Sequence, residues 1–196
     1  HLLGGMTLFA SLSFIAWRSL HMPIILAQAD VMRRWLLAAL ALLVAQIALG
    51  GWISANYAAL ACGGSSMSVD NFPKCVGQWW PTQDYAEGFT LWRGIGVDYE
   101  GGILDGASRI AIQMAHRIVA VVLALYLWLV ALRMFGVPGL RGWASALAAL
   151  VAVQVLLGVL NVKLAVPLAV AVGHVAGAVA LLFVLVSLLA RLRRPE

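Results

Sequence analysis

The sequence predicts an all-α membrane protein: an antiparallel four-helix transmembrane bundle plus one additional transmembrane helix from a preceding bundle. Of the 196 residues, 63% are hydrophobic and only 11% are charged, which is the composition of a membrane protein and not of a soluble domain. A helix needs about 20 apolar residues to cross the ~30 Å hydrocarbon core of a bilayer. Four runs are long enough and a fifth is nearly so: 1–20, 34–57, 110–133, 142–162 and 168–190.

The charged residues give all five runs one consistent orientation. Basic residues gather at alternate helix ends, whereas most acidic residues lie in the long segment 58–109. By the positive-inside rule the basic ends are cytoplasmic and 58–109 is extracytoplasmic. The net charge of +5 therefore reflects membrane topology, and we expect no nucleic-acid partner. The basic ends contain Arg18, Arg33, Arg34, Arg133, Arg141, Arg191, Arg193 and Arg194.

The runs divide the chain into a bundle and its flanking segments. We expect 1–20 to be the last transmembrane helix of a truncated N-terminal bundle, followed by a cytoplasmic loop, 21–33. The C-terminal bundle covers 34–190, includes the extracytoplasmic loop 58–109 and ends in a cytoplasmic tail, 191–196. This division assumes a longer protein, because the chain starts inside an apolar pattern without an initiator Met or a basic leader.

Two short repeats indicate related halves. The pentapeptide 46–50 (QIALG) recurs as 154–158 (QVLLG), and its glutamine lies 13 residues beyond a cytoplasmic arginine in both cases. The tetrapeptide 1–4 (HLLG) recurs as 174–177 (HVAG). Repeats in membrane proteins often reflect duplicated bundles with sites inside or between them. We expect the two glutamines to hydrogen-bond between helices at similar depth.

The two histidines His116 and His174 are the strongest candidates for a functional site. They follow Arg109 and Pro167 by seven residues each, so both lie about 10 Å along their helices from the extracytoplasmic end. An ionisable group in hydrocarbon is costly and usually functional, and two imidazoles at matched depth favour the axial ligands of one heme iron. The alternative is that each histidine only hydrogen-bonds to a neighbouring helix. No carboxylate or thiolate lies at that depth, which disfavours a metal site without a porphyrin.

Glycines and arginines near the histidines fit the heme interpretation. Gly50, Gly158 and Gly177 lie at about the same level and would make room for a flat macrocycle. Arg109 and Arg117 flank the extracytoplasmic end of the third transmembrane helix, where heme propionates would need cationic partners. Snorkelling to the membrane interface explains Arg117 equally well.

The cysteines Cys62 and Cys75 are the only ones in the chain, and both fall in the extracytoplasmic loop. That compartment permits a disulfide bond, which would staple the loop over the bundle. A redox role is the alternative and would require an exposed, strained bridge. A metal site made by two cysteines alone is not expected. Three tryptophans of the loop are expected at the headgroup level: Trp79, Trp80 and Trp92.

Six segments, taken in order, carry a family resemblance. They are 46–62 (QIALGGWISANYAALAC), 72–75 (FPKC), 99–102 (YEGG), 116–117 (HR), 154–161 (QVLLGVLN) and His174. Together they resemble the heme A synthase family, membrane enzymes of cytochrome oxidase biogenesis. The resemblance covers essentially the whole chain and depends on the order and spacing of the segments.

The resemblance implies eight transmembrane helices in two similar bundles, of which this chain matches the end of the first and all of the second. It implies oxidation of the C8 methyl group of heme O to the formyl group of heme A. It also implies a heme b held by His116 and His174 in the second bundle, and a substrate-heme ligand at His1 in the first. Cys62 and Cys75 match the family's cysteine pair in the second outer loop.

This chain departs from the family because the first three helices are absent. The second histidine and the acidic residue of the family's substrate site belong to those helices and are absent with them. We therefore expect this chain to bind heme b without making heme A, and the second bundle to hold no catalytic residue. The resemblance further implies the cytoplasmic (inner) membrane of a bacterium. Membrane lipid, heme O synthase and the cytochrome oxidase assembly machinery are the expected partners.

Two other functions remain open from the sequence. A non-enzymatic b-type cytochrome could take electrons from quinol through the same histidine pair. A heme-free bundle, as in a transporter or an assembly factor, would use the histidines only to join helices. A transporter should show broken helices and a midplane ion path, whereas the glycines here interrupt no apolar run.

Overall fold

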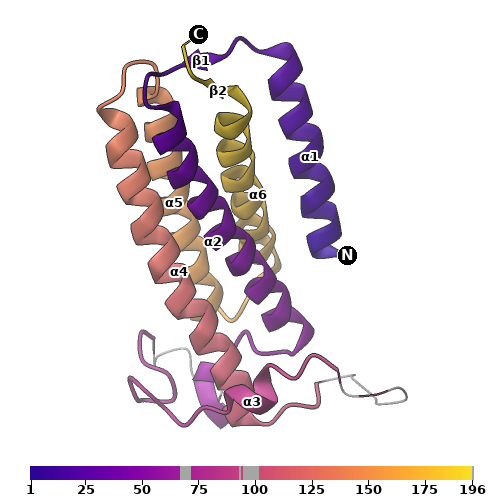
Figure 1. Ribbon diagram of the computed structural model, residues 1–196. Coiled ribbons are helices and arrows are strands. Elements are labelled where there is room, and N and C mark those ends of the chain that lie inside the picture. The colour runs from indigo at the N-terminus through magenta and orange to yellow at the C-terminus, as the bar shows by residue number, and fades with distance from the viewer. Residues whose placement is uncertain (67–71, 93, 95–101, 196) are drawn as a thin grey trace.

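The computed structural model in Figure 1 describes residues 1–66, 72–92, 94 and 102–195. The expected helices are present in these residues, together with two short strands. The elements are α1 (Leu2–Leu20), β1 (Ile24–Ile25), α2 (Ala29–Ala55), the 3-10 helix η1 (Ala61–Ser66), α3 (Tyr85–Gly88), α4 (Gly106–Phe135), α5 (Arg141–Lys163), α6 (Leu168–Arg191) and β2 (Leu192–Arg193).

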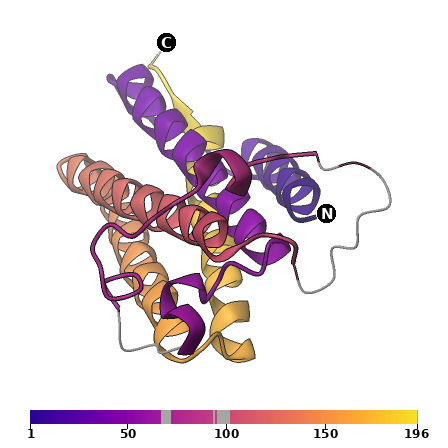
Figure 2. The same ribbon diagram turned by 90° about the horizontal axis from the view of Figure 1, so that it is seen from below.

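The four long C-terminal helices form the predicted antiparallel bundle (Figures 1 and 2). Around the bundle α2 packs against α4, α4 against α5, α5 against α6, and α6 against α2, so α4 and α6 occupy diagonal corners. Within the described residues these four helices are long and apolar enough to cross a membrane. The fold class is therefore confirmed as all-α membrane protein. Helix α1 packs along the outside of α6, and its own course through the membrane stays a prediction.

The helices extend beyond the apolar runs at several ends. Helix α2 begins at Ala29 and not at residue 34, so the connection to α1 is shorter than the expected loop 21–33. Helix α4 begins at Gly106 because the Asp105 carboxylate caps it, accepting a hydrogen bond of 2.8 Å from the Ser108 amide. Hydropathy marks only the part of a helix that suits hydrocarbon, and polar terminal turns therefore escape it.

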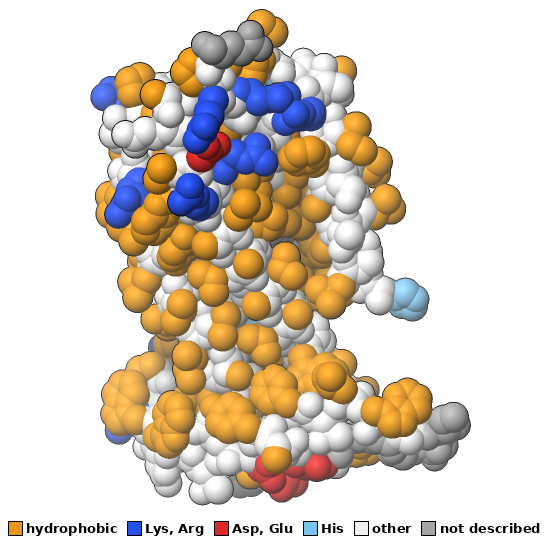
Figure 3. Space-filling view, viewed as in Figure 1, with side chains coloured by type: hydrophobic (Ala, Val, Ile, Leu, Met, Phe, Trp, Pro, Cys, Tyr) orange, Lys and Arg blue, Asp and Glu red, His pale blue; other side chains and the backbone are white. Residues whose placement is uncertain are grey.

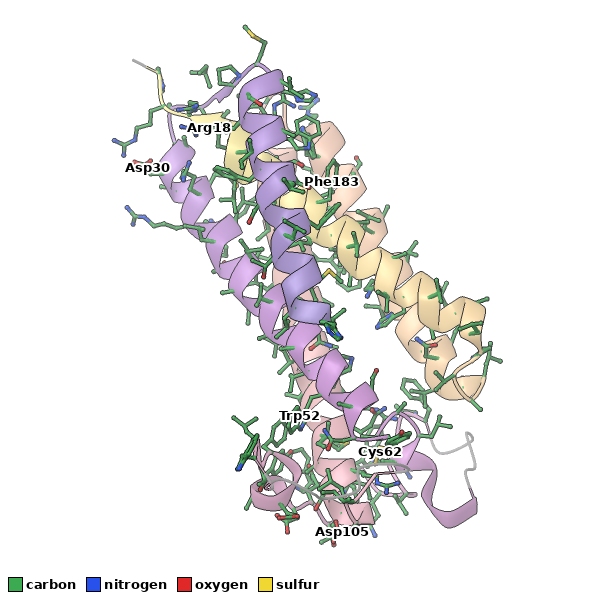
Figure 4. The ribbon with its side chains drawn as sticks, turned by 90° about the vertical axis from the view of Figure 1, so that its right-hand side faces the viewer. Arg18, Asp30, Trp52, Cys62, Asp105 and Phe183 are labelled. Carbon is green, nitrogen blue, oxygen red and sulfur yellow. A yellow bond between two sulfur atoms is a disulfide. The ribbon has the colours of Figure 1, made fainter. Side chains whose placement is uncertain are left out.

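The two ends of the bundle differ in charge. Figure 3 shows Lys and Arg side chains gathered at one end, here called the basic end, where the termini of α1, α2 and α6 meet. Figure 4 places Arg18 and Asp30 at this end, and Trp52, Cys62 and Asp105 toward the opposite end, here called the loop end. This is the distribution on which the predicted membrane orientation depends.

The C-terminal tail is fixed at the basic end. Strand β2 pairs in parallel with β1, and Arg194 forms an ion pair with Asp30. The Arg191 guanidinium donates a hydrogen bond of 3.0 Å to the Met22 carbonyl. The expected tail 191–196 thus starts inside α6 and continues as a strand that ties α6 to the α1–α2 connection.

The segment between α2 and α4 packs over the loop end. It contains η1 and α3, and the Trp52 indole donates a hydrogen bond of 2.9 Å to the Gly88 carbonyl of α3. Its tryptophans Trp79, Trp80 and Trp92 are exposed, as side chains at the headgroup level would be. Of the segment that carries the family resemblance at 99–102, residues 99–101 lie outside the described part of the chain.

The main apolar core fills the half of the bundle toward the basic end. Its largest fully buried side chains include Leu36 of α2, Leu127 of α4, Leu147 of α5 and Leu185 of α6. Every residue of α6 in the range 184–190 is buried. Two small clusters lie at the loop end beneath the α2–α4 segment. The histidine level lies between these packed regions.

Candidate functional site

The structure brings the two predicted histidines together across the bundle. His116 lies on α4 and His174 on α6, the helices at diagonal corners, and the two imidazoles are close enough to interact electrostatically. Their helices run in the same direction, and His116 lies ten residues after the start of α4 whereas His174 lies six residues after the start of α6. His1, by contrast, is exposed at the start of α1.

Each histidine is contacted by a glutamine from a neighbouring antiparallel helix. The Gln46 amide nitrogen lies 3.1 Å from Nδ1 and 3.0 Å from Nε2 of the His116 ring. It also donates a hydrogen bond of 3.3 Å to the His116 carbonyl oxygen. The Gln154 amide donates one of 2.9 Å to the His174 carbonyl oxygen. The expectation that the repeated glutamines join helices is confirmed, and their partner in both cases is a histidine.

The three glycines singled out from the sequence lie against these side chains. A Cβ at Gly50 would stand 3.5 Å from Cε1 of His116, and one at Gly158 would stand 3.2 Å from Cε1 of His174. A Cβ at Gly177 would overlap the Gln154 carboxamide oxygen. The room that the glycines leave is therefore occupied by the imidazoles and by Gln154 in this structure.

Three helices of the bundle bury no side chain around the histidines. No residue is buried in 115–122 of α4, in 152–163 of α5 or in 168–180 of α6. Figure 4 shows the α5–α6 hairpin leaning away from α2 and α4 toward the loop end. A planar cofactor bound among these helices would bury part of this exposed surface.

Several buried polar atoms near the histidines have no hydrogen-bond partner. Buried polar groups are nearly always paired, so each exception needs an explanation. The unpaired atoms are Oε1 of Gln46, Oε1 of Gln154, Nδ1 of His174 and Oδ1 of Asn161. Iron can engage a ring nitrogen of His174, whereas the three amide oxygens need hydrogen-bond donors.

Arg117 links the histidine level to the α2–α4 segment. Its Nη1 atom donates hydrogen bonds of 3.3 Å to the Pro73 carbonyl and 3.4 Å to the Lys74 carbonyl. The Nε and Nη2 atoms are buried without a partner. These two atoms form the fork that binds a carboxylate with two parallel hydrogen bonds. Arg109 is less available, because its Nη2 atom donates to the Gly102 carbonyl at 3.3 Å.

The predicted disulfide is present between Cys62 and Cys75. Both cysteines are buried and pack against Met114 of α4. The bridge fixes the chain just after residues 73–74, whose carbonyls hold Arg117. A stapling role accounts for these contacts.

The donor set fits a macrocycle better than a bare metal ion. Among the described residues there is no group of three or more His, Cys, Asp or Glu side chains that could hold a metal ion. Two imidazoles alone complete the coordination of iron only when a porphyrin supplies the other four ligands. The residues present thus fit a heme with two axial histidines.

Fold and site together define a class: a transmembrane four-helix bundle with one histidine on each of two diagonal helices. The model of the cytochrome oxidase assembly protein family matches residues 1–186, and the chain belongs to that family. Heme A synthase from Shewanella oneidensis is 38% identical to it over 190 residues, which are 96% of this chain and 56% of that protein. The resemblance to heme A synthases is confirmed.

The chain spans about half the length of the curated relative that it matches. No solved structure matches it.

Proposed function

We propose that this chain is the C-terminal, heme b-binding half of a heme A synthase of the bacterial cytoplasmic (inner) membrane. The complete protein would oxidise the C8 methyl group of heme O to the formyl group of heme A for cytochrome oxidase. Family membership and the similarity to a heme A synthase support the biosynthetic role. One observation supports the assignment of this half: His116 and His174 lie on diagonal helices and are close enough to interact electrostatically, in a layer where α4, α5 and α6 bury no residue.

His116 and His174 would hold the heme iron from opposite faces, each through one ring nitrogen. A heme bound in this way supplies one-electron redox chemistry, while the protein sets its potential and access. The apolar core toward the basic end keeps water from that side of the layer. The Nε and Nη2 atoms of Arg117 would bind a propionate, which orients the macrocycle with its carboxylates toward the loop end.

The oxidation itself is assigned to the part of the protein that precedes this chain. His1 would contribute a ligand for the substrate heme there, and the bis-histidine site would serve as an electron-transfer site for the reaction. Heme O synthase as supplier and the cytochrome oxidase assembly machinery as recipient are the proposed partners.

Heme extraction from two expressed proteins tests this function. The full-length protein and this chain are produced beside a source of heme O, and the extracted hemes are separated and identified by mass. We expect heme A from the full-length protein, and heme b without heme A from this chain. Bound heme b but no heme A from the full-length protein would contradict the synthase assignment and favour a non-enzymatic b-type cytochrome.

A further inference from the structure

The contacts of the two glutamines repeat in a way that helix association alone does not require. On α2, Gln46 reaches the His116 carbonyl and Gly50 faces Cε1 of its ring. We call these two residues the α2 cradle. On α5, Gln154 and Gly158 make the same pair of contacts with His174, and they form the α5 cradle. In both cradles the glycine follows the glutamine by four residues, one helical turn.

We propose that the α2 cradle positions His116 and the α5 cradle positions His174, so that the orientation of both axial imidazoles is set by the neighbouring helices. This inference rests on the proposed heme site. The glutamine holds the backbone of the histidine at a fixed height. The glycine lets the ring lie against the neighbouring helix, where any side chain would approach Cε1.

Both glutamines carry an unused acceptor, and that of Gln46 belongs to a carboxamide in contact with the His116 ring. An imidazole that binds iron through one nitrogen keeps its proton on the other, and that N–H needs an acceptor which fixes the ring and raises its basicity. Oε1 is buried and unpaired in both Gln46 and Gln154. The Gln46 carboxamide nitrogen lies 3.1 Å and 3.0 Å from the two ring nitrogens of His116, so a half turn about its last bond would bring Oε1 to the ring N–H in exchange for the hydrogen bond to the His116 carbonyl.

Gly177 lies on α6 and contacts Gln154, the glutamine of the α5 cradle. The Gln154 carboxamide lies where a Cβ of residue 177 would be. An alanine at this position would displace Gln154 without removing any atom of His174. The variant offers a way to disturb the cradle without removing any of its members.

The first experiment replaces Gln46 by methionine in the heme-loaded protein. Gln46→Met keeps the volume of the side chain and removes both its donor and its acceptor. We expect heme to remain bound, the g-values of the low-spin ferric heme to shift, and the midpoint potential to rise, because the ligand loses the acceptor that raises its basicity. The matched control is Tyr126→Phe, which removes a hydrogen bond of 3.2 Å to the Trp35 carbonyl between the same two helices, in the packed half of the bundle.

The second experiment compares Gly177→Ala in the wild-type and the Gln154→Ala backgrounds. Alanine favours a helix over glycine, so both single variants and the double variant are expected to fold. In the wild-type background Gly177→Ala should shift the g-values as Gln154→Ala does. In the Gln154→Ala background it should add nothing, since the displaced side chain is already absent.

Two outcomes would overturn the proposal. One is a Gln46→Met spectrum and potential no different from those of Tyr126→Phe, which would make the glutamine an ordinary contact between helices. The other is an equal effect of Gly177→Ala in both backgrounds, which would place its action on the macrocycle. Failure of the heme site itself is seen separately, as absence of bound heme in the wild-type protein.

Discussion

The glycines that face the imidazoles give a prediction that can be worked from distances. Alanine at residue 158 would put its Cβ 3.2 Å from Cε1 of His174, closer than most Cβ contacts, whereas alanine at residue 50 would stand at an ordinary 3.5 Å from Cε1 of His116. Gly158→Ala must therefore shift the His174 ring by a few tenths of an ångström. A full departure of about 30° from a rotamer costs about 0.5–1.5 kcal/mol, which sets the upper limit of the penalty.

The cost falls on the heme-bound state, because the free ring can turn away while a ligand of iron cannot. We expect Gly158→Ala to raise the Kd for heme about two- to tenfold, and Gly50→Ala to change it by much less. Titration of the heme-free protein in detergent with hemin, followed by absorbance, measures both. Equal weakening by the two variants would refute the reasoning, since it would mean that the glycines make room for the porphyrin and not for the rings.

Three further predictions concern the loop end. Arg117→Met should raise the Kd for heme about tenfold or more, because the charged hydrogen bonds to a propionate are lost. Heme dimethyl ester has no carboxylates, so its Kd should be the same for the variant and the wild type. Replacing Cys62 and Cys75 by serine should lower the unfolding free energy by about 3 kcal/mol, as expected for a separation of 13 residues. The midpoint potential of the heme should stay unchanged, whereas a shifted potential would support the redox role. The hydrogen bond that the Ser108 backbone amide donates to its carboxylate lowers the pKa of Asp105 from 3.8. Its contribution to stability is therefore complete above that pH and is lost as the pH falls through the lowered pKa. Thermal melts of Asp105→Asn and wild type should therefore converge at low pH, and a constant difference at every pH would contradict this assignment.

The sequence was sufficient to predict the helices of the bundle, and it placed one candidate histidine on each of two diagonal helices. Apolar runs locate hydrocarbon-spanning helices well, whereas the equal depth of His116 and His174 and their pairing on one heme stay predictions. The diagonal placement of α4 and α6 follows from chain direction only in part, because helices that run the same way can also be neighbours.

The contacts of individual side chains could not be predicted in the same way. The sequence indicated that Gly177 leaves space, but which side chain enters that space depends on the rotation of α5 against α6, and it is Gln154. Likewise, the sequence offered a propionate partner or snorkelling to the interface for Arg117, and neither predicted that its Nη1 atom holds the loop while Nε and Nη2 have no partner. The repeated spacing of glutamine and glycine was the signal that could have revealed the cradles.

The central claim is that His116 and His174 are the axial ligands of one heme. Reduced and oxidised absorption spectra of the detergent-purified chain, with a pyridine hemochrome to identify the heme, test it most directly beside His116→Ala and His174→Ala. We predict a low-spin b-type spectrum in the wild-type chain that is lost in both variants. Absence of heme from the wild-type chain, or an unchanged low-spin spectrum in either variant, would contradict the claim.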